Sequence, residues 1–207
     1  MSDSILDLAL RTATTPAVGL DLDEHLTSTC AGLVRALGVA AAAVVVLDPL
    51  GAYGSDGGAV LIGEAQLGAA VGPVANVLRS GRPLLTPDLL RVGPPTLAAI
   101  ASDCGLVSSG VVPLRALDRL VGAVQLLGSW EKPVDGDQLD RLAPLADVVA
   151  AQLVDVAALR AAAAPPVHRP APRPRAPQQL ADPEPATTAL YTVPAPRSGQ
   201  PRHSAQL

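Results

Sequence analysis

The sequence has no phenylalanine, and its only other aromatic residues are one tryptophan and two tyrosines among 207 residues. Leucine, valine and alanine must therefore fill any hydrophobic core. A deep aromatic cage around a ligand is hard to build from this set. The hydrophobic content of 49% is nevertheless ample for one ordinary domain of this length.

An excess of positive charge is also missing, because the formal net charge is -4. Surfaces that bind nucleic acid non-specifically or anionic membranes need a concentrated positive field. The first residues, MSDSILDLALRTATT, carry acidic groups where a signal peptide needs basic ones. The apolar run AAAVVVL is far shorter than a membrane span and ends at Asp48-Pro49. We therefore expect a soluble cytoplasmic protein with no membrane partner and no direct nucleic-acid partner.

Cysteine and histidine are scarce as well. Cys30 and Cys104 lie far apart without a CxxC spacing, which fits a reducing compartment better than a disulfide framework. His25 is the only histidine in the first 160 residues, and a lone histidine beside an apolar helix face is usually structural. We expect no metal site and no cofactor.

The composition changes at about residue 161. From there on proline is frequent, large apolar residues are rare, and arginines outnumber acidic residues. Such a segment cannot bury enough apolar surface to offset its chain entropy. We predict a disordered proline-rich tail over residues 161–207, which could be merely solubilising or could dock a protein partner through the PxxP spacing of Pro174 to Pro177.

Residues 1–160 alternate between helical and strand-like patterns. Caps, glycine stops and apolar periodicity predict helices over 3–14, 21–37, 71–79, 95–104 and 135–163, and strands over 41–47, 59–62, 84–86, 107–112 and 120–127. The last helix has a capping box at Asp135 and Gln138, and contains Pro144. The pattern is α+β around a central antiparallel sheet. It suggests an N-terminal helix over 1–18, a domain over 19–160, and the tail.

The last helix carries a heptad-like stripe. Its apolar residues alternate three and four apart, which is typical of a coiled-coil seam. The stripe is wider than one sheet contact should require, so we predict a parallel homodimer with Leu6 and Leu10 of the first helix assisting. The predicted interface residues are Leu139, Leu142, Ala146, Val149, Leu153 and Val156.

Three local motifs, in this order, resemble the GAF domain family. They are SGRPLLTPDLL at 80–90, GLVSSGVVPLRALDRLVGAVQLLG at 105–128, and the helix after VDGDQLDRLAPLADVVAAQL. The resemblance covers roughly residues 20–160. It implies an antiparallel sheet with the first, second and last helices on one face, and short helices over a pocket on the other. It also implies a sensory or regulatory role, in bacterial signalling or transcriptional regulation, with or without a small-molecule ligand.

Two functions from different classes remain open. The first is a non-catalytic regulatory module. The second rests on CGLVSSGVVP, which loosely resembles the stretch around the catalytic cysteine of free methionine sulfoxide reductases, with Cys104 as that cysteine. That chemistry needs a reactive thiolate and a nearby resolving cysteine, and Cys30 fits poorly because its helix face should be buried away from the pocket. We therefore favour the non-enzyme.

Polar residues that could address a ligand are few. Gln125 lies in the middle of a strand and could face the pocket, although hydrogen bonds within the protein or to water explain it equally well. Asp88 and Arg91 could stand at the pocket mouth, but solvated loop charges are the more common case.

Overall fold

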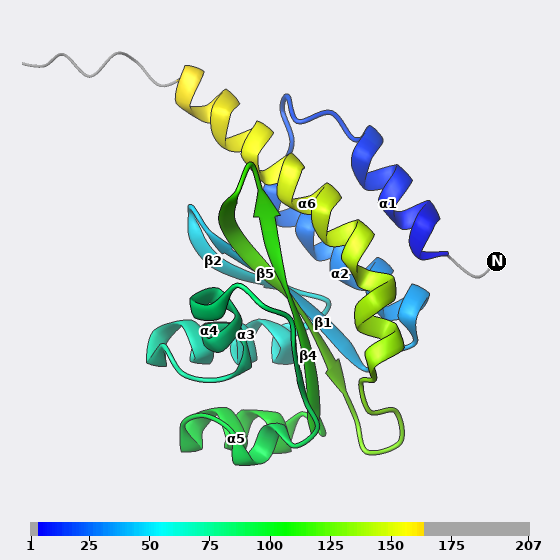
Figure 1. The fold of residues 1–207 in the computed structure, drawn as a ribbon, viewed down its shortest axis with the longest axis vertical. Coiled ribbons are helices and arrows are strands. Elements are labelled where there is room, and N and C mark those ends of the chain that lie inside the picture. Colours follow the sequence, from blue (N-terminus) through cyan, green and yellow to red (C-terminus); the bar gives the residue numbers. More distant parts are fainter. Residues whose placement is uncertain (1–3, 164–207) are drawn as a thin grey trace, which may run out of the picture. The chain divides into compact units, whose positions relative to one another are not determined.

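A five-stranded antiparallel sheet in the order β2-β1-β5-β4-β3 forms the centre of the computed structural model, which describes residues 4–163 (Figure 1). The central strand β5 pairs with β4 along nearly its whole length and with β1 over residues 122–127, so that Val124 lies opposite both Val44 and Val112. The strands are β1 (Ala41–Leu47), β2 (Leu50–Gly54), β3 (Leu84–Thr86), β4 (Ser108–Ala116) and β5 (Arg119–Gly128).

One face of the sheet is covered by the two long helices α2 (Leu22–Leu37) and α6 (Gly136–Ala163), with α1 (Ile5–Thr14) lying outside them (Figure 1). Each begins where a capping residue predicts. The carboxylate of Asp21 accepts hydrogen bonds from the first turn of α2, and Asp135 and Gln138 form the reciprocal capping box of α6. Gly38 ends α2 in the left-handed conformation that glycine adopts without penalty.

The opposite face is covered by three shorter helices. They are α3 (Gly57–Ala69), α4 (Pro73–Ser80) and α5 (Pro95–Asp103), and the one-turn helix η1 (Leu89–Arg91) precedes α5. Two of them begin at prolines, which lack the amide hydrogen that the first turn leaves unused. The α+β class and the placement of the terminal helices on one face are confirmed.

The predicted strand over 59–62 is wrong, because these residues lie in the first turns of α3. Asp56 accepts a hydrogen bond from the amide of Ala59 and caps this helix. A short apolar run fits a buried helix as well as a strand, and α3 has no clear polar side to distinguish them. The second strand is β2 instead, which precedes the glycine-rich turn.

The hairpin between β4 and β5 is tighter than predicted. Both strands continue through the segment expected as a loop, and only Leu117 and Asp118 turn the chain. Both have positive φ, at 49° and 61°, as a two-residue hairpin of the observed twist requires.

The six predicted interface residues of α6 all lie in the chain's own core. Leu142, for example, is 0% exposed and Leu153 is 7% exposed. Five of them, from Leu139 to Leu153, pack with α2 and with the strand residues that face them in one continuous apolar cluster, and Val156 is 4% exposed. As the seam of a dimer they are therefore the wrong residues, because their apolar surface is already buried. Leu6 and Leu10, which were expected to assist, are exposed.

By length and composition α6 could cross a membrane, with a mean hydropathy of 1.7 in its most apolar window. The apolar side that lipid would have to contact is the side that packs on α2 and the sheet. The pair α3 and α4 passes the same test only with a bend of 57° between its members. Residues 161–163 form the end of α6, and the rest of the predicted tail lies outside the described residues.

Candidate functional site

Gln125, the residue that could have addressed a ligand, lies at the centre of a buried hydrogen-bond chain. Its side chain is 0% exposed and faces the layer of α3, α4 and α5. Its amide nitrogen donates to the hydroxyl of Ser109 on β4 at 2.8 Å. Its amide oxygen accepts from the side chain of Gln66 on α3 at 2.9 Å. Both hydrogen-bond partners of the Gln125 amide are thus side chains of the protein itself.

Gln66 on α3 is the last side chain in this series of hydrogen bonds. Its amide nitrogen also donates to the carbonyl of Ile62, and its oxygen accepts from the backbone amide of Val74 at 2.8 Å, in the first turn of α4. Gly72 allows this approach, because an added Cβ there would lie 2.8 Å from the Gln66 oxygen, and its φ of 117° disfavours other residues. One side chain therefore links α3, α4 and the sheet.

Apolar side chains fill the space around these amides. Two clusters of fully or nearly fully buried residues join this face of the sheet to its helices, with Ile62, Leu89 and Leu97 in one and Val74, Val77 and Val111 in the other. Within residues 4–163 every buried side-chain nitrogen and oxygen has a hydrogen-bond partner. Two hollows of about 410 Å³ each lie elsewhere on the domain. Around Gln66 and Gln125 the inner face of the sheet is thus filled by the protein's own side chains.

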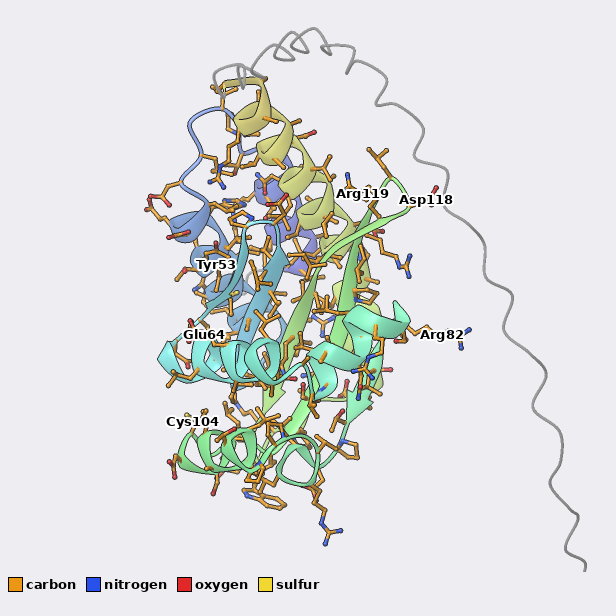
Figure 2. The ribbon with its side chains drawn as sticks, turned by 90° about the vertical axis from the view of Figure 1, so that its left-hand side faces the viewer. Tyr53, Glu64, Arg82, Cys104, Asp118 and Arg119 are labelled. Atoms are coloured by element: carbon orange, nitrogen blue, oxygen red, sulfur yellow. The ribbon has the colours of Figure 1, made fainter. Side chains whose placement is uncertain are left out.

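The two cysteines lie on opposite faces of the sheet. Cys104 is exposed at the end of α5 (Figure 2), and its sulfur lies so close to Gly58 that a Cβ added there would be 2.7 Å away. Cys30 is buried among the residues of α2 and α6, and its thiol donates to the carbonyl of Tyr53 at 3.6 Å. Burial raises the pKa of the Cys30 thiol from 9.0 to about 12. This arrangement confirms that Cys30 is unsuited to resolve an oxidised Cys104.

His25 belongs to a second, partly buried network, which joins α1, α2 and α6. Its Nε2 lies 2.7 Å from the amide oxygen of Gln152 on α6. The Gln152 nitrogen donates to the carbonyls of Thr12 and Thr15 at the end of α1, each at 3.2 Å. Because that nitrogen is used for the carbonyls, the oxygen faces His25, and Nε2 of His25 carries the hydrogen. The structural reading of His25 is confirmed.

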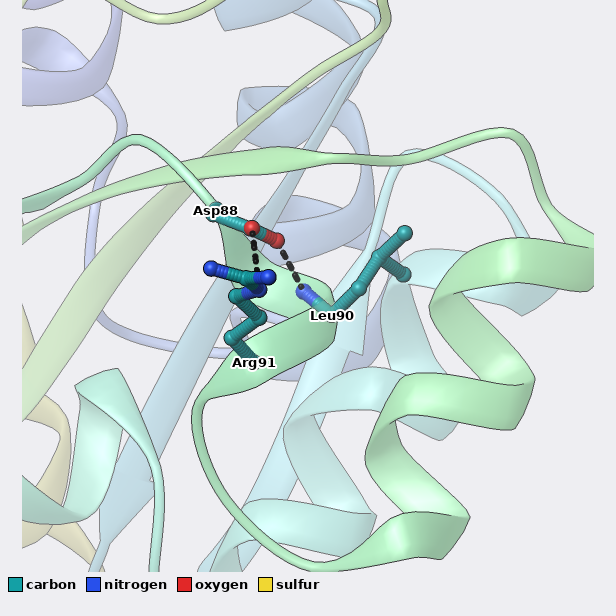
Figure 3. A network of polar contacts seen from close by, with 3 residues as sticks. All are labelled: Asp88, Leu90 and Arg91. Carbon is teal, nitrogen blue, oxygen red and sulfur yellow. Dashed lines mark hydrogen bonds and ion pairs between the residues drawn. The ribbon is translucent and has the colours of Figure 1, made fainter.

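Asp88 and Arg91 form a local contact at the surface (Figure 3). Asp88 accepts from the amide of Leu90 at 3.2 Å and lies 3.5 Å from the Nε of Arg91, whose side chain is 86% exposed. Asp88 caps the one-turn helix η1, and both charged side chains are solvated as expected. In the described part of the chain, no group of three or more histidine, cysteine and acidic side chains is placed to hold a metal ion.

Sequence reasoning missed Gln66 and Gln152. Gln66 stands in the otherwise apolar stretch AVLIGEAQLGA, where a polar residue beside Glu64 looks like part of an exposed helix side. Gln152 lies between apolar residues of the stripe on α6. The only available signal was an uncharged amide within an apolar run, and its partners are far away in the sequence.

Comparison with known proteins identifies the family to which this fold belongs. The sequence profile of the GAF domain matches residues 19–153, and the chain belongs to the GAF domain family, whose members include sensory and regulatory modules. No curated protein matches the chain.

Solved structures share the fold at low sequence identity. The GAF domain of a phosphoenolpyruvate-protein phosphotransferase from Coxiella burnetii is 15% identical, with a TM-score of 0.55 over 77% of this chain and 98% of that one. A domain of a two-component sensor histidine kinase protein from Sinorhizobium meliloti is 14% identical, with a TM-score of 0.53 over 70% and 98%. The free methionine-R-sulfoxide reductase of Neisseria meningitidis is 17% identical, with a TM-score of 0.52 over 75% and 89%.

Proposed function

We propose that this chain is a non-catalytic regulatory module of the GAF type, in bacterial signalling or transcriptional regulation, that works without a small molecule on the inner face of its sheet. The observation that carries the proposal is the buried chain of Ser109, Gln125 and Gln66. A site that takes a polar ligand leaves donors and acceptors open for it. Here the side-chain amide of Gln66 already donates to the amide oxygen of Gln125 and accepts from the first turn of α4, so these groups are not open to a ligand.

The thiol arrangement supports a role without catalysis. A sulfoxide reductase of this fold needs a thiolate that attacks sulfur and a second thiol that reduces the resulting sulfenic acid. Cys104 is at the surface and Cys30 is behind the sheet with a strongly raised pKa. The structural likeness to the Neisseria enzyme, at 17% identity, concerns the fold alone.

Turnover of free methionine-R-sulfoxide, with dithiothreitol as reductant, tests the absence of catalysis. We expect the full chain and its Cys104→Ser variant to show the same background rate. A rate above background that disappears in Cys104→Ser, with the circular dichroism spectrum unchanged, would establish the enzyme instead. Cys30→Ala serves as the matched control, since it removes the buried thiol and leaves Cys104 in place.

Native mass spectrometry of the chain purified from its own host tests the closed inner face. We expect the mass of the polypeptide alone, or of its multiples. A stoichiometric small molecule that is lost on denaturation would contradict the proposal.

We further propose that the module acts as a homodimer. Since the residues expected to form its seam are buried in the core, another surface has to provide the interface.

A further inference from the structure

The helix α1 carries apolar residues on two sides, and only one side docks on α2 and α6. On the docked side Leu8 and Thr12 are buried, and Ile5 and Ala9 are partly buried. Leu6 and Leu10 are 68% and 64% exposed. Two leucines thus remain in water while a threonine is buried, whereas a helix held permanently in a core turns its leucines inward. This distribution favours a helix that also exists away from its docked position.

The part of α2 that receives Leu8 is small and polar. Leu8 packs on Gly32, so closely that a Cβ added there would lie 2.6 Å from its Cδ1. Thr29 and His25 precede Gly32 by three and seven residues and share its side of the helix. The hydroxyl of Thr29 donates to the carbonyl of His25 at 2.9 Å, so it needs no partner on α1. Removal of α1 would uncover a glycine and satisfied polar groups, which water solvates at little cost.

The contact that α6 makes with α1 is polar as well. The side chain of Gln152 donates to the carbonyls of Thr12 and Thr15, each at 3.2 Å. Its oxygen lies 2.7 Å from Nε2 of His25 on α2. Water can replace the two carbonyls when α1 leaves, whereas the bond to His25 joins α2 to α6 and stays in place. The attachment of α1 can therefore be undone without separating the two helices beneath it.

The segment that joins α1 to α2, residues 15–21, packs loosely. Two hollows, of about 410 and 370 Å³, are lined by its residues Val18, Gly19 and Leu20, one against α2 and one against the end of α6. Val18 is 77% exposed. Gly19 has a φ of 72°, and no atom of the described residues lies within 4 Å of a Cβ added there. Few side-chain contacts therefore resist a movement of this segment.

We propose that α1 is a releasable strap, which leaves its place on α2 and α6 while the sheet and the other helices stay folded. The proposal rests on the regulatory role proposed above and gives it a moving part. Release makes two surfaces available, the side of α2 and α6 that holds His25 and Gln152, and the side of α1 that holds Leu8. A partner that binds either surface shifts the balance towards the open form.

Thiol labelling of the full chain at neutral pH distinguishes release of α1 from unfolding of the whole domain. Cys104→Ser removes the exposed thiol, and Thr12→Cys places a thiol of similar size on the docked side of α1. Cys30, in the core, reports global unfolding in the same molecule. We expect residue 12 to be labelled at least about 100-fold faster than Cys30. Thr14→Cys, at an exposed position of α1, gives the rate without protection and should be faster still. Equal rates at residue 12 and Cys30 would overturn the strap.

Amide exchange of the unsubstituted chain provides a second arm. Release of α1 exposes little surface, so exchange in residues 9–14 should depend only weakly on urea, whereas exchange in β5 should follow the steep dependence of global unfolding. Leu8→Ala should raise exchange in α1 by about 30-fold or more. Leu10→Ala, the matched loss of an exposed leucine from the same helix, should change it by less than about threefold.

The same steep urea dependence in α1 and β5 would show that α1 leaves only when the domain unfolds, which overturns the strap. Equal effects of Leu8→Ala and Leu10→Ala would contradict the docked side described here. Both results leave the non-catalytic proposal to the turnover assay. They also leave the proposed homodimer to sedimentation velocity, in which a chain that stays monomeric at high micromolar concentration contradicts it.

Discussion

At position 66 a single amide satisfies three groups, the carbonyl of Ile62, the amide oxygen of Gln125 and the backbone amide of Val74. Gln66→Leu keeps the approximate volume but leaves the last two without partners inside an apolar layer. Each buried unsatisfied group costs about 1–3 kcal/mol, so we expect the free energy of unfolding to fall by roughly 2–5 kcal/mol. Urea denaturation measures this.

Glu64→Leu is the control for that substitution, since Glu64 lies on the same helix with its side chain exposed (Figure 2). Its effect should remain within about 0.5 kcal/mol. If Gln66→Leu were as harmless as the control, then water would reach the inner face and the closed-face proposal would fail.

Cys30 should make stability depend on alkaline pH. Its folded pKa of about 12 lies above the ordinary value of 9.0 because burial disfavours the thiolate. The unfolded chain therefore loses this proton first, and the contribution is complete below about pH 9 and is lost as pH rises towards 12. We expect a slope of up to about 1.4 kcal/mol per pH unit from this group.

Denaturation at a series of pH values measures that slope, and Cys30→Ala should lack it. Labelling with a thiol reagent at neutral pH provides a second check. The exposed Cys104 should react in the native protein and Cys30 only after unfolding. Equal labelling rates of both thiols would show that Cys30 is not buried as described.

Individual residues show where sequence reasoning reached the site and where it did not. Gln125 stood out because a polar side chain interrupts a strand of apolar residues. Gln66 did not stand out, because its role depends on a hydrogen bond to a residue 59 positions away in the sequence. A hydrogen bond between distant segments leaves no local pattern, so the closing of the inner face could only be seen in three dimensions.

Among the elements, α1 depends on its polar contact with the neighbouring helices. Its carbonyl groups at Thr12 and Thr15 accept from Gln152, and its main apolar anchor is the buried Leu8. Gln152→Ala should therefore loosen α1 and raise the amide-exchange rates of residues 5–14, with little change in β1 or β5. Asp155→Ala, an exposed change on α6, should leave these rates unaltered.

Helix boundaries were largely predictable because their signals are local. Asp21, Asp135 and Gln138 cap the helices as their positions in the sequence indicate, and Gly81 ends α4. The hairpin was less predictable, because Leu117 is not a typical turn residue. The segment 59–62 failed for another reason, since α3 exposes apolar residues such as Leu61, so its exposed side has no regular polar pattern.

For the whole molecule, the stripe on α6 illustrates a general ambiguity. A heptad-like pattern says that one helix side is buried, and it does not say against what. In this chain α2 and the sheet cover that side, and α1 covers α2 and α6 in turn. The sequence therefore predicted the burial of Leu142 and its neighbours, and assigned it to the wrong partner.

The two faces of the sheet should differ in stability. The face under α2 and α6 holds one continuous core with most of the large leucines, whereas the opposite face is divided into two smaller clusters under short helices. Leu142 and Leu97 are both 0% exposed, one in each layer, and provide a matched pair. Leu142→Ala should lower the global free energy of unfolding by about 2–5 kcal/mol, because its cavity lies in the core that unfolds last. Leu97→Ala should instead raise amide exchange mainly in α5, through local opening below the denaturation midpoint. Exchange that rises equally in all elements for both variants would show that the two layers unfold as one unit.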